Sequence, residues 1–308
     1  MEIVNTISNN YSKKSSLTIG AFDTIHKGHR YLMENIKQNL SEDDDFIVIT
    51  FSPNPKYVLG KNSLYEKKIL SVNKKREILE SLGVDILCEL DFNENFSKIT
   101  AEKFLSDYII SPFSPNKIFI GHDLHFGHNK EGNFDFLKSN EGKYGYDTIS
   151  VPPVLLNETV ISTFSIRNDI LGGRMDNVFE KLGFYYEVEG EVKKGKGLGK
   201  KISFPTANID ISSNDMLLPR NGVYLVEVHL PDGKNQYGMA NIGYRPTVSD
   251  ADKISLEVHI FNFKKPLYQC KLKVSFISYI RNEIKFDSID ALKDQIVQDE
   301  MKCKEMMN

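Results

Sequence analysis

The chain has 308 residues and a net charge of -3, and it is 40% hydrophobic and 26% charged. At about 150 residues per domain this length predicts two domains, and the composition excludes a largely disordered chain. The near-balance of charge argues against a protein whose main task is to coat nucleic acid.

The cysteines and the apolar runs narrow the class of protein further. Cys88, Cys270 and Cys303 are too few and too scattered for a disulfide framework or a cysteine-based zinc site, so reduced structural thiols are expected. Residues 1–15 contain no apolar run of signal-peptide length. No later segment approaches the roughly 20 apolar residues of a membrane span. These features predict a cytoplasmic protein.

The first half of the chain alternates short apolar runs with stretches of helical spacing. Strands are predicted at 17–20, 46–51, 118–121 and 148–151, and helices at 32–40 and 74–82. This alternation predicts an α/β fold in which helices cover both faces of a parallel sheet. Right-handed crossovers bring the loops after the strands to one edge of the sheet, where ligands usually bind.

After Leu182 the apolar residues recur with a period of two, strictly so in 254–260. This period predicts antiparallel strands with one buried face, and a small β-barrel or sandwich fits best. From Ser288 the spacing is helical again, which predicts a C-terminal helix that covers one end of the barrel. The expected domains are residues 1–182 and 183–308.

A first group of chemically active residues lies where the first strand meets the first helix, in the run GAFDTIHKGH. Gly20 and Gly28 allow close approach of the backbone to a ligand, and the start of the helix favours phosphate. His26 and His29 can converge on one cluster of oxygens. They would donate hydrogen bonds to the charge that develops as a pyrophosphate leaves.

Two further loops of the first half are candidates for ligand contact. In the run ISTFSIR, the hydroxyls of Ser162 and Thr163 and the guanidinium of Arg167 suit phosphate oxygens, although the two hydroxyl residues could also simply cap a helix. In the run GHDLHFGH at 121–128, histidines recur every third residue. Glycines bracket this run, so a zinc site is disfavoured and a loop that contacts nucleotide or flavin is favoured.

The second half contains a basic glycine loop with Gly195, Gly197 and Gly199, which can wrap phosphate with its backbone N–H groups. The run PTAN follows soon after it. The Thr206 hydroxyl and the Asn208 carbonyl lie two residues apart, so on a strand they face the same side. Both are hard oxygen ligands of the kind that Mg²⁺ accepts beside substrate phosphates.

Glu257 stands in the strictly alternating segment and faces away from Leu256 and Val258. A carboxylate at the inner end of a small barrel can take the proton of a primary alcohol during phosphoryl transfer. The plainer alternative is a glutamate on an edge strand that faces solvent.

The run at 20–29 resembles the G-x-F-D-G-x-H-x-G-H signature of the nucleotidyltransferase superfamily, and 161–167 resembles its I-S-S-T-x-I-R motif. This resemblance implies a Rossmann-like domain that binds ATP through both motifs, Phe22 and Asp23 included. The loop at 121–128 resembles the G-x-D-F-x-F-G loop of bacterial FAD synthetases, which implies flavin contact at Asp123 and Phe126. The sequence departs from the usual motif residues at Thr24, Ser52, Asn54 and Phe164.

The run SFPTAN at 203–208 resembles the G-F-P-T-A-N signature of riboflavin kinases, and further motifs of that family follow in order to residue 296. The resemblance implies that Glu257 is the catalytic base and that Thr206 and Asn208 hold Mg²⁺. It also implies that the glycine loop binds ATP and that Arg281 contacts the flavin.

Together the two halves resemble the bifunctional bacterial riboflavin kinase/FAD synthetase family. The resemblance implies ATP-dependent phosphorylation of riboflavin to FMN and adenylylation of FMN to FAD. ATP with Mg²⁺, riboflavin and FMN would be its partners, the flavins being substrate and product rather than bound groups. No nucleic acid, membrane or obligate protein partner is expected. The alternatives are a riboflavin kinase with an impaired adenylyltransferase domain, a flavin-sensing regulatory protein, and a cytidylyltransferase with an unrelated β-domain.

Overall fold

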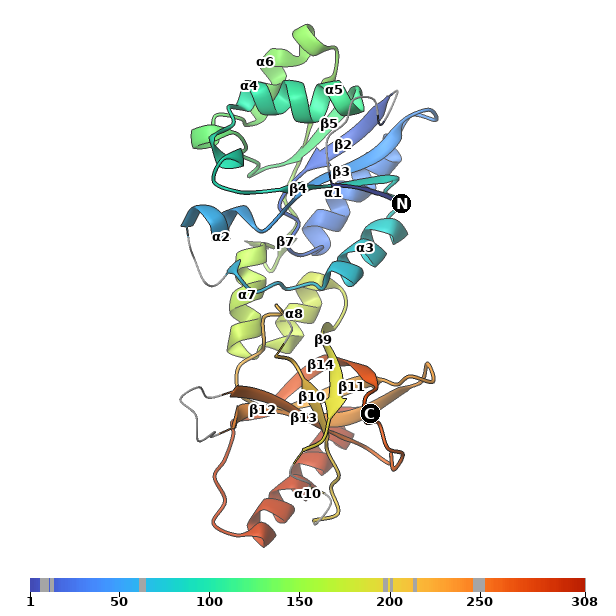
Figure 1. Cartoon of the computed structure of the whole chain (residues 1–308), viewed down its shortest axis with the longest axis vertical. Helices are drawn as coiled ribbons and strands as arrows, with labels where there is room; N and C mark the ends of the chain where they lie inside the picture. The colour runs from blue at the N-terminus through green and yellow to red at the C-terminus, as the bar shows by residue number, and fades with distance from the viewer. Residues whose placement is uncertain are drawn as a thin grey trace. The chain divides into compact units, whose positions relative to one another are not determined.

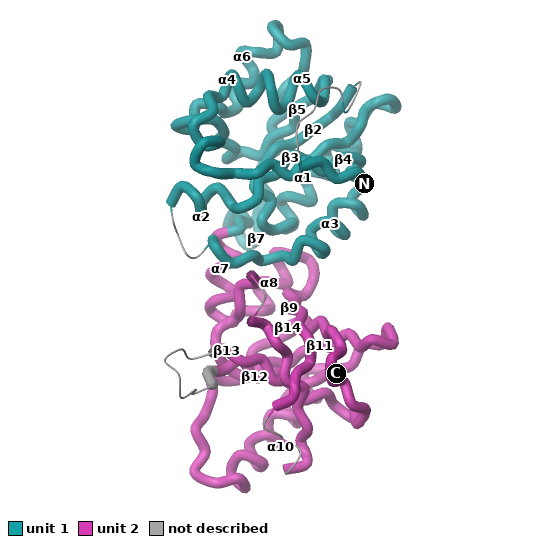
Figure 2. The backbone as a smooth tube through the Cα atoms, in the orientation of Figure 1, with its two compact units in different colours: residues 1–163 teal, residues 164–308 magenta. Residues whose placement is uncertain are grey.

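The computed structural model describes residues 1–5, 11, 14–60, 65–195, 199, 202–212, 215–245 and 253–307. The chain forms two compact units, residues 1–163 and 164–308, which Figure 2 colours separately. The predicted change of period after Leu182 falls at the end of helix α8. The placing of a domain boundary at that residue stays a prediction.

The first unit is built on a six-stranded sheet in the order β1-β4-β3-β2-β5-β6. Every neighbouring pair in it is parallel, so the predicted α/β fold is confirmed (Figure 1). Its strands are β1 (Glu2–Val4), β2 (Ser15–Ile19), β3 (Asp45–Ser52), β4 (Ile86–Asp91), β5 (Pro115–Gly121) and β6 (Asp147–Val151). A separate small hairpin consists of β7 (Leu155–Leu156) and β8 (Thr159–Val160).

Several helices of the first unit, among them α1, α3 and α6, bury apolar residues in its core. In α1, Leu32, Met33 and Ile36 are buried at helical spacing. The helical segments are α1 (Lys27–Gln38), α2 (Pro55–Gly60), α3 (Val72–Ser81), η2 (Phe96–Lys98), α4 (Ala101–Phe104), η3 (Leu105–Ile110), α5 (Ser111–Phe113), η4 (His128–Lys130) and α6 (Phe134–Tyr144).

The strand order places a topological switch at β2, which pairs with β3 on one side and β5 on the other. In open parallel sheets, ligands bind at the carboxyl ends of the strands at such a point. The loops that leave β2 and β5 begin at Gly20 and after Gly121, so both loops singled out in the sequence start at this edge.

The second unit contains a closed antiparallel barrel in the order β10-β13-β12-β11-β14-β9, which confirms the predicted barrel. Tyr224, Val226, Leu256, Val258 and Phe276 are among its fully buried residues. The strands are β9 (Tyr186–Lys193), β10 (Ala207–Asp210), β11 (Gly222–His229), β12 (Asn235–Arg245), β13 (Lys253–Ile260) and β14 (Lys271–Arg281). Helices α7 (Thr163–Gly172) and α8 (Met175–Leu182) precede the barrel.

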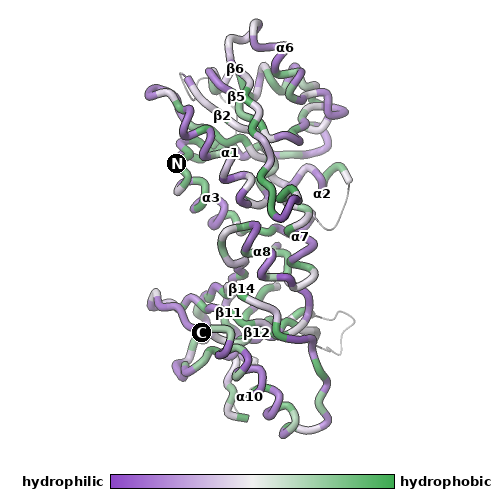
Figure 3. The backbone as a smooth tube through the Cα atoms, turned by 180° about the vertical axis from the view of Figure 1, so that it is seen from behind, coloured by the Kyte–Doolittle hydropathy of each residue, from purple (hydrophilic) through white to green (hydrophobic). Residues whose placement is uncertain are grey.

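The predicted C-terminal helix is α10 (Ile289–Met306), and Ser288 caps its N-terminus by accepting from the backbone N–H of Ala291. Figure 3 shows that α10 carries both hydrophilic and hydrophobic residues, as a helix packed on one side does. Its Cys303 is buried in a cluster with Val223, Leu225 and Met239. No helix in the described part of the chain is long and apolar enough to cross a membrane.

Candidate active sites

The loop after β2 is held close to the sheet by its own side chains. The backbone N–H of Gly20 donates to the oxygen of Ile49 on β3 over 3.0 Å. The buried ring of Phe22 lies against Gly20, where a Cβ would be 2.9 Å from the ring. Phe22 itself has a φ of 37°. The glycine is needed here because the chain folds back over this ring before it reaches Asp23.

The two histidines of the motif stack on each other at the start of α1. His26 is the N-cap, and its Nδ1 accepts a hydrogen bond from the backbone N–H of His29 over 3.2 Å. The two ring centroids lie 3.7 Å apart, with an interplanar angle of 14°. Gly28 makes room for this stack, since a Cβ there would lie 3.0 Å from the ring of His26. The structure thus brings together both histidines predicted to converge.

Their hydrogen bonds give the two neutral rings different tautomers. The Nδ1 of His29 lies 2.6 Å from the backbone oxygen of Thr24. Because a carbonyl oxygen only accepts, this Nδ1 carries the proton and the Nε2 of neutral His29 is a lone pair. The Nδ1 of His26 accepts from an N–H, so neutral His26 carries its proton at Nε2.

Both histidines are neutral near pH 7. Burial, and to a smaller extent the neighbouring His29, lower the pKa of His26 to about 2. Burial also lowers the pKa of His29 to about 4, although the Thr24 oxygen and the Asp123 carboxylate act in the opposite direction. The free protein therefore offers a phosphate one ring N–H donor, from His26. The expectation that both rings donate holds only when His29 gains a proton.

The second phosphate motif meets the first through two hydroxyl groups. The Oγ1 of Thr163 lies 3.0 Å from the Oγ1 of Thr24. Ser162 is half-buried, while Arg167 on α7 is fully buried one helical turn after Thr163. Thr24, a departure from the usual motif glycine, therefore has a structural role of its own in joining the two motifs.

The other residues that depart from the usual motifs are Phe164, Ser52 and Asn54. Phe164 is 53% exposed, so the aromatic ring that stands at this position is not part of the core. The backbone oxygen of Ser52 accepts from the N–H of Phe92 over 3.0 Å. Asn54 accepts from the backbone N–H of Lys56 over 2.9 Å and so supports the start of α2.

The loop after β5 holds the two residues expected to contact flavin, but it separates them. Asp123 is exposed, and its charge acts on His29. Phe126 is buried in the core, with its ring centroid 5.4 Å from that of Phe104 and 5.9 Å from that of Phe136. The backbone of Phe126 also pairs with Gly132. Asp123 thus lies at the histidine site, and flavin contact at either residue stays a prediction.

Lys75, in the first half of α3, belongs to the same edge of the sheet and was missed in the sequence. Its Nζ donates to the Oγ1 of Thr50 over 2.9 Å, and this hydroxyl donates to the backbone oxygen of Ala21 over 3.0 Å. Burial lowers the pKa of Lys75 to about 8, although Glu89 and Asp23 act in the opposite direction. No motif marks Lys75, which stands in a lysine-rich helical stretch.

In the second unit, the register of the barrel brings the predicted kinase residues together. Five strands each place one residue at the same level, and directly opposed residues share a face of the sheet. In order round the barrel these residues are Asn208, Glu257, Asn241, Val223 and Arg281. Asn241 was not predicted as a site residue, and only the strand pairing reveals that it is next to Glu257.

These five residues lie on the outer face of the barrel, which corrects the expectation of a carboxylate at the inner end of the barrel. Leu256 and Val258 are fully buried and point to the opposite side from Glu257. Val223, which shares the face of Glu257, packs with Cys303 of α10. Since a helix cannot enter a barrel of this size, the Glu257 face is the outer one.

The predicted metal ligands lie beside Glu257. The Oγ1 of Thr206, just before β10, donates to the Oε2 of Glu257 over 3.3 Å. Asn208 is directly opposite Glu257 in the register. Gly195 leaves room for the Asn208 amide, since a Cβ there would lie 2.3 Å from its Nδ2. Three oxygen-bearing side chains therefore converge, and this donor set suits Mg²⁺.

The glycine loop is described only in part. Gly199 accepts from the backbone N–H of Phe204 over 2.9 Å, and a Cβ at Gly199 would lie 2.3 Å from the Phe204 oxygen. Gly199 also lines the cavity beside Glu257. Gly197 lies outside the described residues.

A cavity of about 270 Å³ lies between the Glu257 face and α10. Thr206, Asn241 and Glu257 line one side, while Val223 and Ile296 are among its apolar lining residues. An apolar pocket with a few fixed polar groups is typical of sites for a large planar ligand.

Arg281 lines the same cavity but is held by a buried carboxylate. Its Nε and Nη2 donate to Asp299 of α10 over 2.7–3.0 Å, and Gln295 also donates to Asp299. Asp299, which was not predicted, therefore fixes the guanidinium that was expected to contact flavin. Flavin contact at Arg281 itself stays a prediction.

Comparisons with known proteins agree with this division of sites. The family model described as FAD synthetase matches residues 8–165, and the one described as riboflavin kinase matches residues 182–307. A Buchnera aphidicola (Schizaphis graminum) protein named bifunctional riboflavin kinase/FMN adenylyltransferase is 33% identical over 305 residues, which are 97% of this chain and 96% of that protein. The Escherichia coli K12 protein of the same name is 32% identical, over 94% of this chain and 91% of that protein.

Nearly the whole chain is also similar to a solved structure. It is described as a macrolide-efflux protein from Streptococcus pneumoniae and has a TM-score of 0.89, with 31% identity over 99% of both chains. Its description differs from the names of the sequence relatives. The likeness shows that the same two-part fold extends over the whole length of both proteins.

Proposed function

The chain belongs to the bifunctional riboflavin kinase/FMN adenylyltransferase family, and we propose that its two sites make FAD from riboflavin and two molecules of ATP. The barrel site phosphorylates riboflavin to FMN, and the histidine site adenylylates FMN to FAD with release of pyrophosphate. The observation that carries the proposal is the convergence of Thr206, Asn208 and Glu257 beside one cavity.

In the kinase step, the 5′-hydroxyl oxygen of riboflavin attacks the γ-phosphorus of ATP. The new P–O bond forms as the bond to the β-phosphate oxygen breaks, ADP leaves, and the hydroxyl proton passes to the Glu257 carboxylate. Asn241 is beside Glu257 in the register and lines the same cavity, so it can orient the hydroxyl or the carboxylate.

Mg²⁺ bound with ATP fits the oxygen donors of Thr206 and Asn208, and it would neutralise charge on the phosphates. The hydrogen bond from Thr206 to Glu257 orients the carboxylate. Because Asn208 and Glu257 stand on paired strands, the separation between the phosphate-binding and proton-accepting groups is set by the barrel.

In the adenylyl step, a phosphate oxygen of FMN attacks the α-phosphorus of ATP, and the bond to the β-phosphate breaks. The Nε2–H of His26 is ready to donate to the leaving pyrophosphate. His29 donates only as an imidazolium, and the negative triphosphate raises its pKa by attraction. Asp123 acts on His29 in the same direction.

The retained base and oxygen ligands argue against a protein that only senses flavin. Binding alone requires no proton acceptor, yet Glu257 is placed in the cavity with Thr206 beside it. The cytidylyltransferase alternative does not account for this second site. A cytoplasmic location and the absence of a macromolecular partner stay predictions from the sequence.

The test is chromatography of the products formed from riboflavin, ATP and Mg²⁺. The wild-type protein is expected to give FMN first and FAD afterwards. Glu257→Gln is expected to abolish FMN formation but to adenylylate added FMN at the wild-type rate. Glu227→Gln on β11, outside the cavity lining, is the matched control and is expected to make FMN normally. A wild-type reaction that ends at FMN would leave only the kinase half of the proposal.

A further inference from the structure

Lys75 projects from α3 toward the loop that carries the histidine motif. Its ammonium nitrogen lies 2.9 Å from the Thr50 hydroxyl, which in turn bonds to the backbone of Ala21. Ala21 comes directly before Phe22 and Asp23 in the motif loop. The ammonium is close enough to His29 for each charge to act on the other. Lys75 is therefore at the edge of the sheet where the triphosphate would bind.

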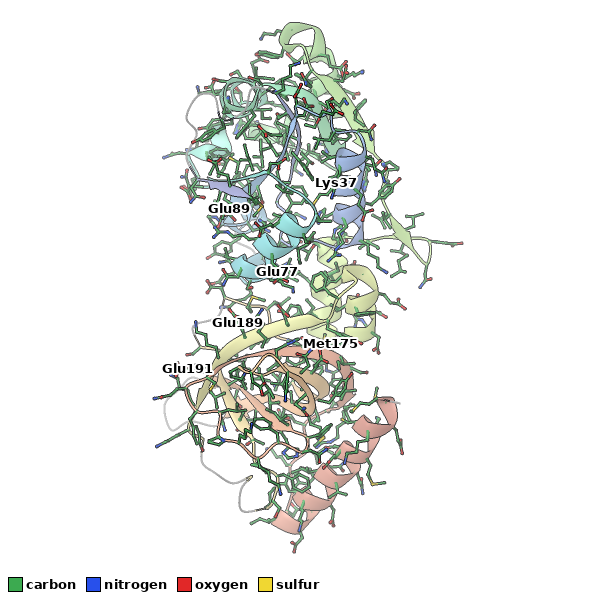
Figure 4. The ribbon with its side chains drawn as sticks, turned by 90° about the vertical axis from the view of Figure 1, so that its right-hand side faces the viewer. Lys37, Glu77, Glu89, Met175, Glu189 and Glu191 are labelled. Atoms are coloured by element: carbon green, nitrogen blue, oxygen red, sulfur yellow. The ribbon has the colours of Figure 1, made fainter. Side chains whose placement is uncertain are left out.

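The ammonium group of Lys75 belongs to a half-buried side chain, and it has no carboxylate of its own. Within the described part of the chain, its hydrogen-bond partner is the neutral Thr50 hydroxyl, and no ion pair holds it. The nearby Glu89 carboxylate is taken by Arg76, at 2.5 Å. Figure 4 labels Glu89, together with Glu77 on α3. A desolvated cation is costly unless an anion joins it, and an ammonium has three donors, of which Thr50 uses one.

We propose that Lys75 is a catalytic residue of the adenylyl step, whose ammonium binds the β- or γ-phosphate of ATP and stabilises the leaving pyrophosphate. This inference rests on the proposed function of the first unit. It supplies what the histidines lack, because neutral His26 offers one donor and neutral His29 offers none. A bound polyphosphate would lie between two groups that otherwise disfavour each other's charge, Lys75 and protonated His29.

The step balances without proton transfer from Lys75. The FMN phosphate oxygen forms the new bond to the α-phosphorus, and the electron pair of the broken bond leaves with the β-phosphate oxygen. The added negative charge on pyrophosphate is then next to a fixed ammonium. Preorganised donors at such a position are typically worth about 100- to 1000-fold in rate.

The first test is Lys75→Met, with FAD formation measured from added FMN and ATP. We expect a loss of about 100- to 1000-fold in kcat/KM for ATP. Phosphorylation of riboflavin by the same preparation should be unchanged, because Glu257 belongs to the other unit. The matched control is Lys74→Met, since Lys74 on the same helix pairs with the exposed Glu77. A rate for Lys75→Met within threefold of wild type would overturn the proposal.

A second variant separates phosphate binding from support of the loop. Thr50→Val removes the partner of Lys75 and the bond to Ala21 but keeps the ammonium. If Lys75 only supports the loop, Thr50→Val should lose as much activity as Lys75→Met. If Lys75 binds phosphate, Thr50→Val should keep most of the activity. Equal losses in the two variants would therefore contradict the proposal.

The pH profile gives a readout that a supporting role would not change. Burial lowers the pKa of free Lys75 to about 8, so kcat/KM for ATP should fall above that pH. The charged groups that act on Lys75 are Asp23, Glu89, Arg76 and Lys68, besides His29, which is neutral there. Lys75→Arg keeps its charge at every pH, so its alkaline limb should move upward by more than one pH unit. If the alkaline limb of the Lys75→Arg profile stays at the wild-type pH, Lys75 is not the titrating group.

Wild-type product analysis distinguishes this proposal from the one it rests on. If the wild-type protein makes no FAD, the adenylyltransferase function fails and Lys75 has no such role to play. If it makes FAD and Lys75→Met does so equally well, the function stands and the Lys75 inference fails.

Discussion

Burial of two uncharged histidines makes the stability of the first unit depend on pH. In the unfolded chain both rings have a pKa near 6.5, while in the folded protein the pKa values are about 2 for His26 and about 4 for His29. Below pH 6.5 the unfolded state therefore binds more protons, and folding loses stability as the pH falls. Above pH 6.5 the contribution of the two histidines to the unfolding free energy no longer changes with pH.

The expected size of this pH dependence follows from the one proton that each histidine ring can bind. Each histidine should remove about 1.4 kcal/mol of unfolding free energy per pH unit below 6.5, or about 2 kcal/mol between pH 6.5 and 5. The unfolding free energy of His29→Gln can be measured with urea at these two pH values. Its fall between them should be about half of the fall that the two histidines together cause in the wild-type protein. His128→Gln, at an exposed position at the start of η4, controls for the removal of a histidine. A His29→Gln protein as acid-sensitive as wild type would contradict the assignment.

Ser203 shows how a single departure from a family motif can be tested for its backbone cost. The riboflavin kinase motif that this chain resembles has glycine here, and Ser203 has a φ of 68°. A side chain in this region costs about 1 kcal/mol, partly offset by the greater chain entropy of glycine when unfolded. Ser203→Gly should therefore raise the unfolding free energy by about 0.5 kcal/mol.

Asn262 is the matched control for this measurement. It also has a positive φ, of 57°, in the same unit. Asparagine tolerates this conformation better than serine does, so Asn262→Gly should change stability by less than Ser203→Gly. Equal gains at the two positions, measured by denaturant unfolding, would show that the serine carries no particular strain.

At the scale of the element, one buried ion pair attaches α10 to the barrel. Asp299 has a side chain that is 5% exposed, and it receives the guanidinium of Arg281 from β14. Breaking a buried pair by removing one partner typically costs about 3–5 kcal/mol, because the remaining charge stays buried. Since Leu292 and Ile296 of α10 line the cavity, the fit of the helix also shapes the binding site.

Asp299→Ala should therefore lower stability by about 3 kcal/mol and raise KM for riboflavin. The adenylylation of added FMN should not change, because the histidine site is in the other unit. The control is Asp294→Ala, at an exposed position of the same helix. If Asp299→Ala destabilises the protein but leaves KM for riboflavin unchanged, α10 is a support for the barrel and not a wall of the site.

The same pair shows what sequence reasoning can and cannot find. Period and spacing located the strands around Glu257 and the helix after Ser288, because burial imposes those periods directly. Spacing within a motif likewise placed His26 next to His29, one helical turn apart. Asp299 and Asn241 were missed because their neighbours are fixed by strand register and helix packing, which no local pattern records.

Two further differences have a physical cause. Glu257 was expected at the inner end of the barrel, but alternation alone says only that it opposes Leu256 and Val258. Which face is inner depends on where the remaining apolar residues and α10 go. Lys75 was missed because a lysine in an amphipathic helix usually faces solvent, and its desolvation becomes visible only where α3 meets the end of β3.

At the scale of the whole molecule, each proposed catalytic group belongs to its own unit. His29 lies in residues 1–163 and Glu257 in residues 164–308, and the family models divide the chain in a similar way. The product of the barrel reaction is the substrate of the histidine reaction. The two activities should therefore be separable by mutation. If FMN is released into solution between the steps, two variants that each lack one activity should together make FAD.

Mixing two inactive variants tests this. With riboflavin and ATP, Glu257→Gln alone should form no product, because its kinase base is absent. His29→Ala alone should stop at FMN, with FAD formation reduced about 100- to 1000-fold. An equimolar mixture should make FMN at once and FAD after a lag, during which free FMN accumulates. Wild-type protein at half the total concentration sets the reference rate for each step.

The rate of FAD formation after the lag shows whether FMN passes through solution. If FMN diffuses freely, the rate of FAD formation in the mixture should match that of Glu257→Gln supplied with the same concentration of FMN. If the mixture makes FMN but no FAD, although Glu257→Gln accepts added FMN, the flavin must stay bound to the chain that phosphorylated it. That outcome would contradict independent sites, because two units that exchange substrate through solution cannot distinguish their own product from another chain's.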